Sequence, residues 1–182
     1  METMLRKTAV AGQFYPSDKT QIKNQIEGFI QKQTAKKEAL GAVMPHAGYI
    51  YSGKVAANVA NSIEIKDTCI LIGPNHTGFG KAFSIMAQGQ WQTPLGQVKI
   101  NQELAEKLVS ESTYLEKDLL AHQFEHSIEV QLPFLKFFKD DVRIVPIIVA
   151  QAGLNQYIEL GRQISLLGGF ILTRLMMMMT IL

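Results

Sequence analysis

Apolar and polar positions follow one another along this chain in blocks that are typical of helices alternating with short strands. After Ser-Asp-Lys at residues 17–19, apolar residues recur every three or four positions, which predicts an amphipathic helix over residues 18–34. Comparable patterns predict helices over 53–62, from Asn101 onward, over 127–138 with a kink or a new start at Pro133, and over 154–167.

Short apolar runs predict buried strands between these helices. The runs cover residues 39–44, 68–73 and 143–150, with shorter strands at 83–87 and 97–100 and a turn at 93–96 between the last two. Strands that are apolar throughout are typical of parallel sheets covered on both faces. We therefore expect an α/β fold, an α/β/α sandwich in which helices flank both faces of a mostly parallel sheet.

Composition and charge exclude several classes of protein. The 182 residues carry 18 Lys and Arg against 16 Asp and Glu, and this net charge of +2 without a long basic run argues against nucleic-acid binding. No apolar stretch of signal-peptide length begins the chain, and Arg174 interrupts the apolar segment 166–182, so we expect a cytoplasmic protein that binds no membrane. The single cysteine, Cys69, excludes an intrachain disulfide.

Two of the four histidines stand directly after predicted buried strands. His46 lies in the segment Pro-His-Ala-Gly-Tyr that follows the first strand, and His76 lies in Gly-Pro-Asn-His-Thr-Gly after the second. In α/β sheets, ligands bind outside the carboxyl ends of the strands. Two converging imidazoles suit zinc, iron or copper, completed by a carboxylate or thiolate. The alternative is that both histidines only hydrogen-bond to backbone groups.

A third candidate lies in Glu-His-Ser-Ile-Glu at residues 125–129. His126, at the start of a predicted helix, is suited to proton transfer, and the helix start offers N–H donors to an anion. The alternative is that Glu125 and Ser127 cap the helix while His126 fills a polar gap. We expect His122 to be solvated or to stand behind the site, and not to be a ligand.

Five motifs occur in order along the chain: Ala11-Gly12-x-Phe14-Tyr15-Pro16, Pro45-His46-Ala47-Gly48-Tyr49, Gly73-Pro74-Asn75-His76, Thr93-Pro94-Leu95-Gly96 and Glu125-His126-Ser127-Ile128-Glu129-Val130-x-Leu132-Pro133-Phe134. Together they resemble the Memo family, whose prokaryotic members are called AmmeMemoRadiSam system protein B. The similarity extends from about residue 8 to about residue 164. It implies a fold like that of class III extradiol dioxygenases, which use non-haem iron in a crevice at the end of the sheet.

The resemblance also implies roles for individual residues. In the family, the histidines that match His46 and His76 are metal ligands. The one that matches His126 lies by the same pocket, where we expect a catalytic acid or base or a substrate-orienting group. The side chains expected to contact a substrate are Tyr49, Asn75 and Glu125. The expected cofactor is non-haem iron or copper, with zinc as a further option, and the expected partners are a small molecule or peptide and, in a homo-oligomer, a second copy of the chain.

The chain departs from the family near its end. Family members continue beyond the position of Ile164 and carry a later cysteine as third metal ligand, whereas here no histidine, cysteine or carboxylate follows Glu159. We therefore expect a Memo-like domain over residues 1–165, followed by a divergent apolar tail over 166–182. The family fold would then be truncated, and the segment that carries the third ligand in the family would supply none here.

Three functions follow as hypotheses. The first is a Memo-like metalloprotein with extradiol-dioxygenase-like or redox chemistry. The second is a non-catalytic binding protein that uses the same cleft for an anionic peptide or a small ligand. The third is a truncated product that has part of the fold and no activity.

Overall fold

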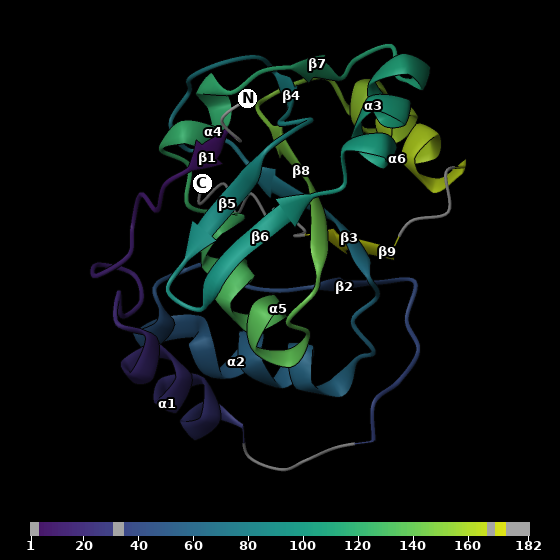
Figure 1. The fold of residues 1–182 in the computed structure, drawn as a ribbon. Helices are drawn as coiled ribbons and strands as arrows, with labels where there is room; N and C mark the ends of the chain where they lie inside the picture. The colour runs from purple at the N-terminus through teal and green to yellow at the C-terminus, as the bar shows by residue number, and fades with distance from the viewer. Residues whose placement is uncertain (1–3, 31–34, 167–169, 174–182) are drawn as a thin grey trace, which may run out of the picture.

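One curled, mostly parallel sheet organises the chain in the computed structural model, which describes residues 4–30, 35–166 and 170–173 (Figure 1). Its strands run in the order β1-β5-β6-β8-β3-β9-β2, and β4 joins β8 from the side and also pairs with β7. The strands are β1 (Leu5–Arg6), β2 (Gly41–Val43), β3 (Thr68–Pro74), β4 (Phe83–Ile85), β5 (Gln90–Thr93), β6 (Gly96–Ile100), β7 (Glu116–Lys117), β8 (Arg143–Val149) and β9 (Phe170–Thr173).

Helices cover the sheet on both sides, as the sequence predicted. They are α1 (Lys19–Phe29), α2 (Tyr49–Ser62), α3 (Gln102–Glu111), α4 (Leu120–Gln123), the short 3₁₀ helix η1 (Glu129–Gln131), α5 (Leu132–Phe138) and α6 (Leu154–Leu166). Helices α1, α2 and α5 contact one another below the sheet in Figure 1, and α3 contacts α6 at its upper right. The α/β fold class is therefore confirmed.

The pair β3 and β8 forms the centre of the sheet. The two strands run parallel in register from Thr68 opposite Arg143 to Pro74 opposite Val149. Ile70, Leu71 and Val145 are buried, as expected for strands that are covered on both faces. This rigid centre holds the carboxyl end of β3, where the candidate chemistry lies.

Some elements differ from their predictions. Helix α2 begins at Tyr49 and not at residue 53, and the turn at residues 93–96 joins β5 to β6 instead of joining the predicted strands 83–87 and 97–100. Strand β5 was not predicted because only Trp91 of its four residues is strongly apolar, although that side chain is fully buried. Pro133 lies in the first turn of a new helix, α5, which begins at Leu132, and its missing N–H is tolerated there.

The segment predicted as an apolar tail contributes to the sheet. Strand β9 inserts between β3 and β2 and pairs parallel with both. The remaining tail residues, 167–169 and 174–182, lie outside the described residues. In the part of the chain that is described, no helix has both the length and the apolar character needed to cross a membrane.

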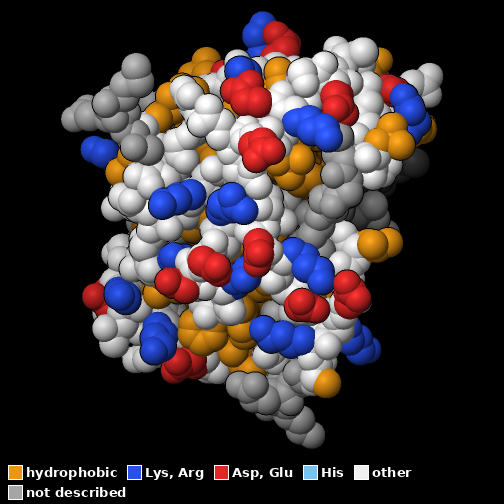
Figure 2. Space-filling model, turned by 45° about the vertical axis from the view of Figure 1, so that its right-hand side comes forward, with side chains coloured by type: hydrophobic (Ala, Val, Ile, Leu, Met, Phe, Trp, Pro, Cys, Tyr) orange, Lys and Arg blue, Asp and Glu red, His pale blue; other side chains and the backbone are white. Residues whose placement is uncertain are grey.

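Charged side chains of both signs are mixed on the face drawn in Figure 2. Exposed ion pairs are present, such as Lys139 with Asp67 at 2.8 Å and Lys66 with Glu38 at 3.1 Å. Exposed pairs of this kind contribute about 0–1 kcal/mol each, so they add little to a fold that depends on its buried core.

Candidate metal centre

Three loops bring histidines to one edge of the sheet. His46 follows β2, His76 follows β3, and His126 lies in the loop before η1. Strands β2 and β3 both run parallel to β9, so their carboxyl ends reach the same edge. The sequence-based prediction that the loops of His46 and His76 converge there is confirmed.

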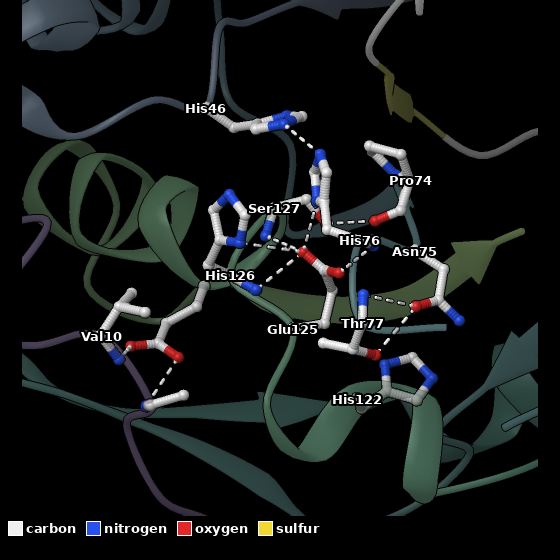
Figure 3. Close-up of polar contacts among 12 residues, drawn as sticks. Val10, His46, Pro74, Asn75, His76, Thr77, His122, Glu125, His126 and Ser127 are labelled. Atoms are coloured by element: carbon white, nitrogen blue, oxygen red, sulfur yellow. Dashed lines mark hydrogen bonds and ion pairs between the residues drawn. The ribbon is translucent and has the colours of Figure 1, made fainter. Parts of the chain in front are cut away.

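The three imidazoles form a tight cluster (Figure 3). The Nε2 atoms of His46 and His76 lie 3.3 Å apart, and the His76 and His126 rings stack with centroids 4.6 Å apart. One nitrogen from each ring lies within 4.8 Å of the others. Within the described ranges, no second group of three histidine, cysteine, aspartate or glutamate side chains meets this condition.

Gly73 permits the close approach between the end of β3 and the loop of His126. A Cβ atom at this position would lie 2.5 Å from Ser127 Oγ and 3.0 Å from Ile128 Cγ1, which is closer than atoms can pack. Ser127 Oγ in turn donates a hydrogen bond to the carbonyl of Pro74 at 3.0 Å. The glycine therefore brings His76 beside the segment that carries Glu125 and His126.

The carboxylate of Glu125 joins two of the imidazoles. Its Oε1 lies 3.0 Å from Nδ1 of His76 and 3.3 Å from Nδ1 of His126 (Figure 3). It also accepts the backbone N–H groups of His76, His126 and Ser127. Burial disfavours the charged form, but the hydrogen bonds from His76 and from the backbone outweigh it and keep the pKa of the Glu125 carboxyl below its usual value.

A second buried carboxylate, that of Glu129, fastens the N-terminal segment to this loop. It forms an ion pair with Arg6 and accepts the Tyr15 hydroxyl at 2.7 Å, together with the backbone N–H groups of Ala9 and Val10. Burial and the neighbouring Glu129 raise the pKa of Tyr15, so its hydroxyl stays protonated. Sequence reasoning placed Glu129 in a motif without a role, because its partners lie more than a hundred residues away.

Arg6 extends the same network to the backbone of the site. Its guanidinium donates to the carbonyls of Glu125 at 2.7 Å and His122 at 3.1 Å, and it lies 4.3 Å from the centre of the Trp91 ring. These contacts saturate a buried charge, which would otherwise be costly. Nothing in the local sequence around Arg6 indicated this role.

Two residues expected to contact a substrate have contacts within the protein. Tyr49 is buried, donates its hydroxyl to the carbonyl of Val130 at 2.9 Å and stacks on Phe134. The side-chain oxygen of Asn75 accepts N–H groups of Thr77 and Gly78 and so shapes the loop of the second histidine. Contact of Tyr49, Asn75 or Glu125 with a substrate stays a prediction.

His122 lies outside the cluster, as expected, but one of its two expected surroundings is wrong. The side chain is fully buried against Trp91, with ring centroids 5.9 Å apart, and is not solvated. Neither ring nitrogen has a hydrogen-bond partner among the described residues. Burial lowers the pKa of His122 to about 4, so the imidazole is neutral at physiological pH.

The cluster fits a transition-metal ion. Two ligand nitrogens at the usual distance of about 2.0–2.1 Å in a tetrahedral site stand roughly 3.4 Å apart. The 3.3 Å between Nε2 of His46 and Nε2 of His76 matches this separation. Imidazole ligands suit zinc, copper and iron, and a carboxylate behind the ring is the usual support of such a ligand. His126 brings a third imidazole nitrogen to the cluster, and the sequence had assigned this residue to proton transfer and not to the metal.

Cys69 does not belong to this cluster. It lies at the end of β3 that is far from His76, where its Sγ contacts the carbonyl of Lys66. Burial raises the pKa of its thiol to about 12. The thiol is therefore neutral and packs as a small apolar side chain.

Comparison with known proteins connects this site to a family. A family model described as Memo-like protein matches residues 6–167. A MEMO1 family protein of Pyrobaculum arsenaticum is 42% identical over 173 residues, covering 88% of this chain and 62% of the relative. One from Saccharolobus islandicus strain L.S.2.15 is 48% identical over 168 residues, covering 84% of this chain and 59% of the relative. The chain therefore spans about three-fifths of the length of these curated relatives.

Proposed function

The chain belongs to the Memo family, and on that premise we propose that it binds one non-haem metal ion, iron or copper, through His46 and His76. The observation that carries this proposal is the 3.3 Å contact between the two Nε2 atoms, at the spacing of two ligands of one ion. The side chain of His76 is 41% exposed, which gives an ion and a ligand access from solvent.

His126 acts beside the metal as the group that moves a proton. Its Nδ1 faces the Glu125 carboxylate at 3.3 Å, and its ring stacks on that of His76. An imidazole whose Nδ1 donates to a carboxylate presents Nε2 as a base, which accepts a proton from a hydroxyl and later returns it. Phe14 packs against the His126 ring with centroids 4.8 Å apart and limits its rotation.

When bound, iron or copper supplies Lewis-acid and one-electron redox chemistry at coordination positions that the imidazoles leave open. The chain's own residues orient the ligands, exclude water from the buried side of the site and hold the proton of His126. A small aromatic diol is the substrate class that suits such a centre, and extradiol-dioxygenase-like or other redox chemistry is the corresponding reaction class.

Metal analysis tests the binding proposal. Protein stripped with a chelator is reconstituted with Fe(II) without oxygen, or with Cu(II) or Zn(II), desalted, and measured for metal content. We expect about one equivalent in the wild type and less than about a tenth in the double variant His46→Ala/His76→Ala. His126→Ala retains the metal in this proposal and loses turnover.

His122→Leu is the matched control, because this histidine lies outside the cluster and its replacement leaves all three imidazoles in place. A metal content that is equally low in the wild type and in the double variant would contradict the proposal. If binding of a small ligand or an acidic peptide survives chelation, the second hypothesis, a non-catalytic binding protein, accounts better for the site.

A further inference from the structure

We infer that Glu125 is a positioning residue of the metal centre and that it fixes the hydrogen of two imidazoles with one carboxylate. It holds the hydrogen of His76 and that of His126 on Nδ1, so that Nε2 of each ring carries a lone pair. The role of these lone pairs at a metal rests on the proposed metal-binding function. The positions of the two hydrogens can be tested without metal.

The hydrogen-bond chemistry of the carboxylate carries this inference. An ionised carboxylate only accepts hydrogen bonds, so a ring nitrogen that bonds to it must donate. Oε1 of Glu125 forms a hydrogen bond with Nδ1 of His76 at 3.0 Å, and Nδ1 of His126 lies at ion-pair distance from the same oxygen, 3.3 Å. In a neutral imidazole, a hydrogen on Nδ1 leaves Nε2 as the acceptor and the metal ligand.

The contact between His46 and His76 agrees with this arrangement. Their Nε2 atoms lie at hydrogen-bond distance, 3.3 Å, which requires one donor and one acceptor. Because His76 carries its hydrogen on Nδ1, its Nε2 accepts and Nε2 of His46 donates in the metal-free protein. A single carboxylate therefore sets the direction of hydrogen bonding through the cluster.

The carboxylate is itself held by several hydrogen bonds, which suits it to positioning the imidazoles. Glu125 is 0% exposed, and its oxygens accept backbone N–H groups of His76, His126 and Ser127. Its carbonyl is fixed by Arg6, which in turn pairs with the buried Glu129. A substrate that enters at the exposed side of His76 would reach the imidazoles before this buried group.

Nitrogen-15 NMR of the chelator-treated protein tests the inference directly. Long-range proton–nitrogen spectra show which ring nitrogen of each histidine carries the hydrogen. In the wild type we expect His76 and His126 with the hydrogen on Nδ1. In Glu125→Ala the acceptor is absent, and we expect both rings to become mixtures of the two tautomers.

Zinc affinity provides the second readout. Glu125→Gln keeps an oxygen that accepts from the imidazoles, so we expect it to restore the tautomers while the lost charge weakens the Kd for Zn(II) about 10-fold. Glu106→Gln makes the same carboxyl-to-amide change on α3, where Glu106 pairs with Lys117 and contacts no imidazole. We expect its Kd to stay within roughly threefold of the wild type, because it does not support a ligand.

Each failure is distinguishable. Unchanged tautomers in Glu125→Ala would overturn the inference. Should that variant not fold, equal zinc affinities in Glu125→Gln and Glu106→Gln would overturn it instead. If the wild type binds no zinc, iron or copper, the proposed function fails, while a tautomer change in the metal-free Glu125→Ala would still support the role of Glu125.

Discussion

The buried imidazole of His122 makes the stability of this protein depend on pH in mildly acidic solution. Burial lowers its pKa from 6.5 to about 4, an effect that Asp118 opposes and Arg6 reinforces. Between these two values the unfolded chain binds a proton that the folded chain excludes, so stability falls as the pH decreases through this window. Above about pH 7 neither state binds the proton and the effect disappears.

The size of the effect follows from the difference between the two pKa values. One pKa unit corresponds to about 1.4 kcal/mol, so His122 contributes a loss of about 2 kcal/mol at pH 5 and about 3 kcal/mol at pH 4, relative to neutral pH. Losses of this size are a large fraction of the free energy of unfolding of a natural domain, which is roughly 5–15 kcal/mol.

This contribution is measured by urea unfolding of the metal-free wild type and of His122→Leu at pH 7 and pH 5. The quantity compared is the free energy of unfolding. The leucine has a similar volume and no titrating group, and the backbone carbonyl that accepts from Arg6 is retained. Because the ring nitrogens have no partner among the described residues, we expect the variant to match the wild type within about 1 kcal/mol at pH 7. At pH 5 we expect the wild type to have lost about 2 kcal/mol more than the variant.

The other three histidines are present in both proteins, so their titration cancels in this comparison. Parallel pH dependence of the two proteins, within about 0.5 kcal/mol, would refute the reasoning, because it would mean that the buried imidazole takes up its proton without unfolding.

Three further substitutions test the packing and the network that support the site. In Gly73→Ala the new methyl group collides with Ser127, and we expect a loss of about 1–3 kcal/mol in urea unfolding together with weaker zinc binding, whereas an unchanged stability would contradict the close approach. Tyr15→Phe removes the donor to Glu129, and we expect a loss of about 1.5–3 kcal/mol, measured in the same way. Asn101→Ala removes the cap of α3, far from the site, so we expect about 1 kcal/mol of lost stability with unchanged metal affinity.

Much of the fold was predictable because it depends on local patterns. The apolar runs of β3 and β8 and the helical spacing of α1 indicated these elements directly. Asn101 was predicted to begin α3, and its side chain does accept the N–H of Leu104. Strand β5 was missed because its burial comes from pairing with β6 and β1 and not from an apolar pattern of its own.

The histidines also differ in how far their positions could be predicted from the local sequence. His46 and His76 were predictable as a pair, since each follows a strand that ends at the same edge of a parallel sheet. For His122 the option of a solvated side chain was wrong, because a histidine in a polar stretch gives no sign that Trp91 will pack on it from another part of the chain. The expectation that it is not one of the clustered histidines agrees with the structure.

The sequence by itself determined the α/β class, the family and the two histidine loops, because periodicity and short motifs depend only on residues that are close together in the sequence. Only the tertiary structure decided that Glu125 serves two imidazoles and that Arg6 and Glu129 fix the loop which carries it. Apart from the contact between the neighbouring residues Glu125 and His126, these contacts join residues 49 to 123 positions apart. Hydrogen bonds of buried charges depend on distance and direction in three dimensions, and no local pattern specifies either.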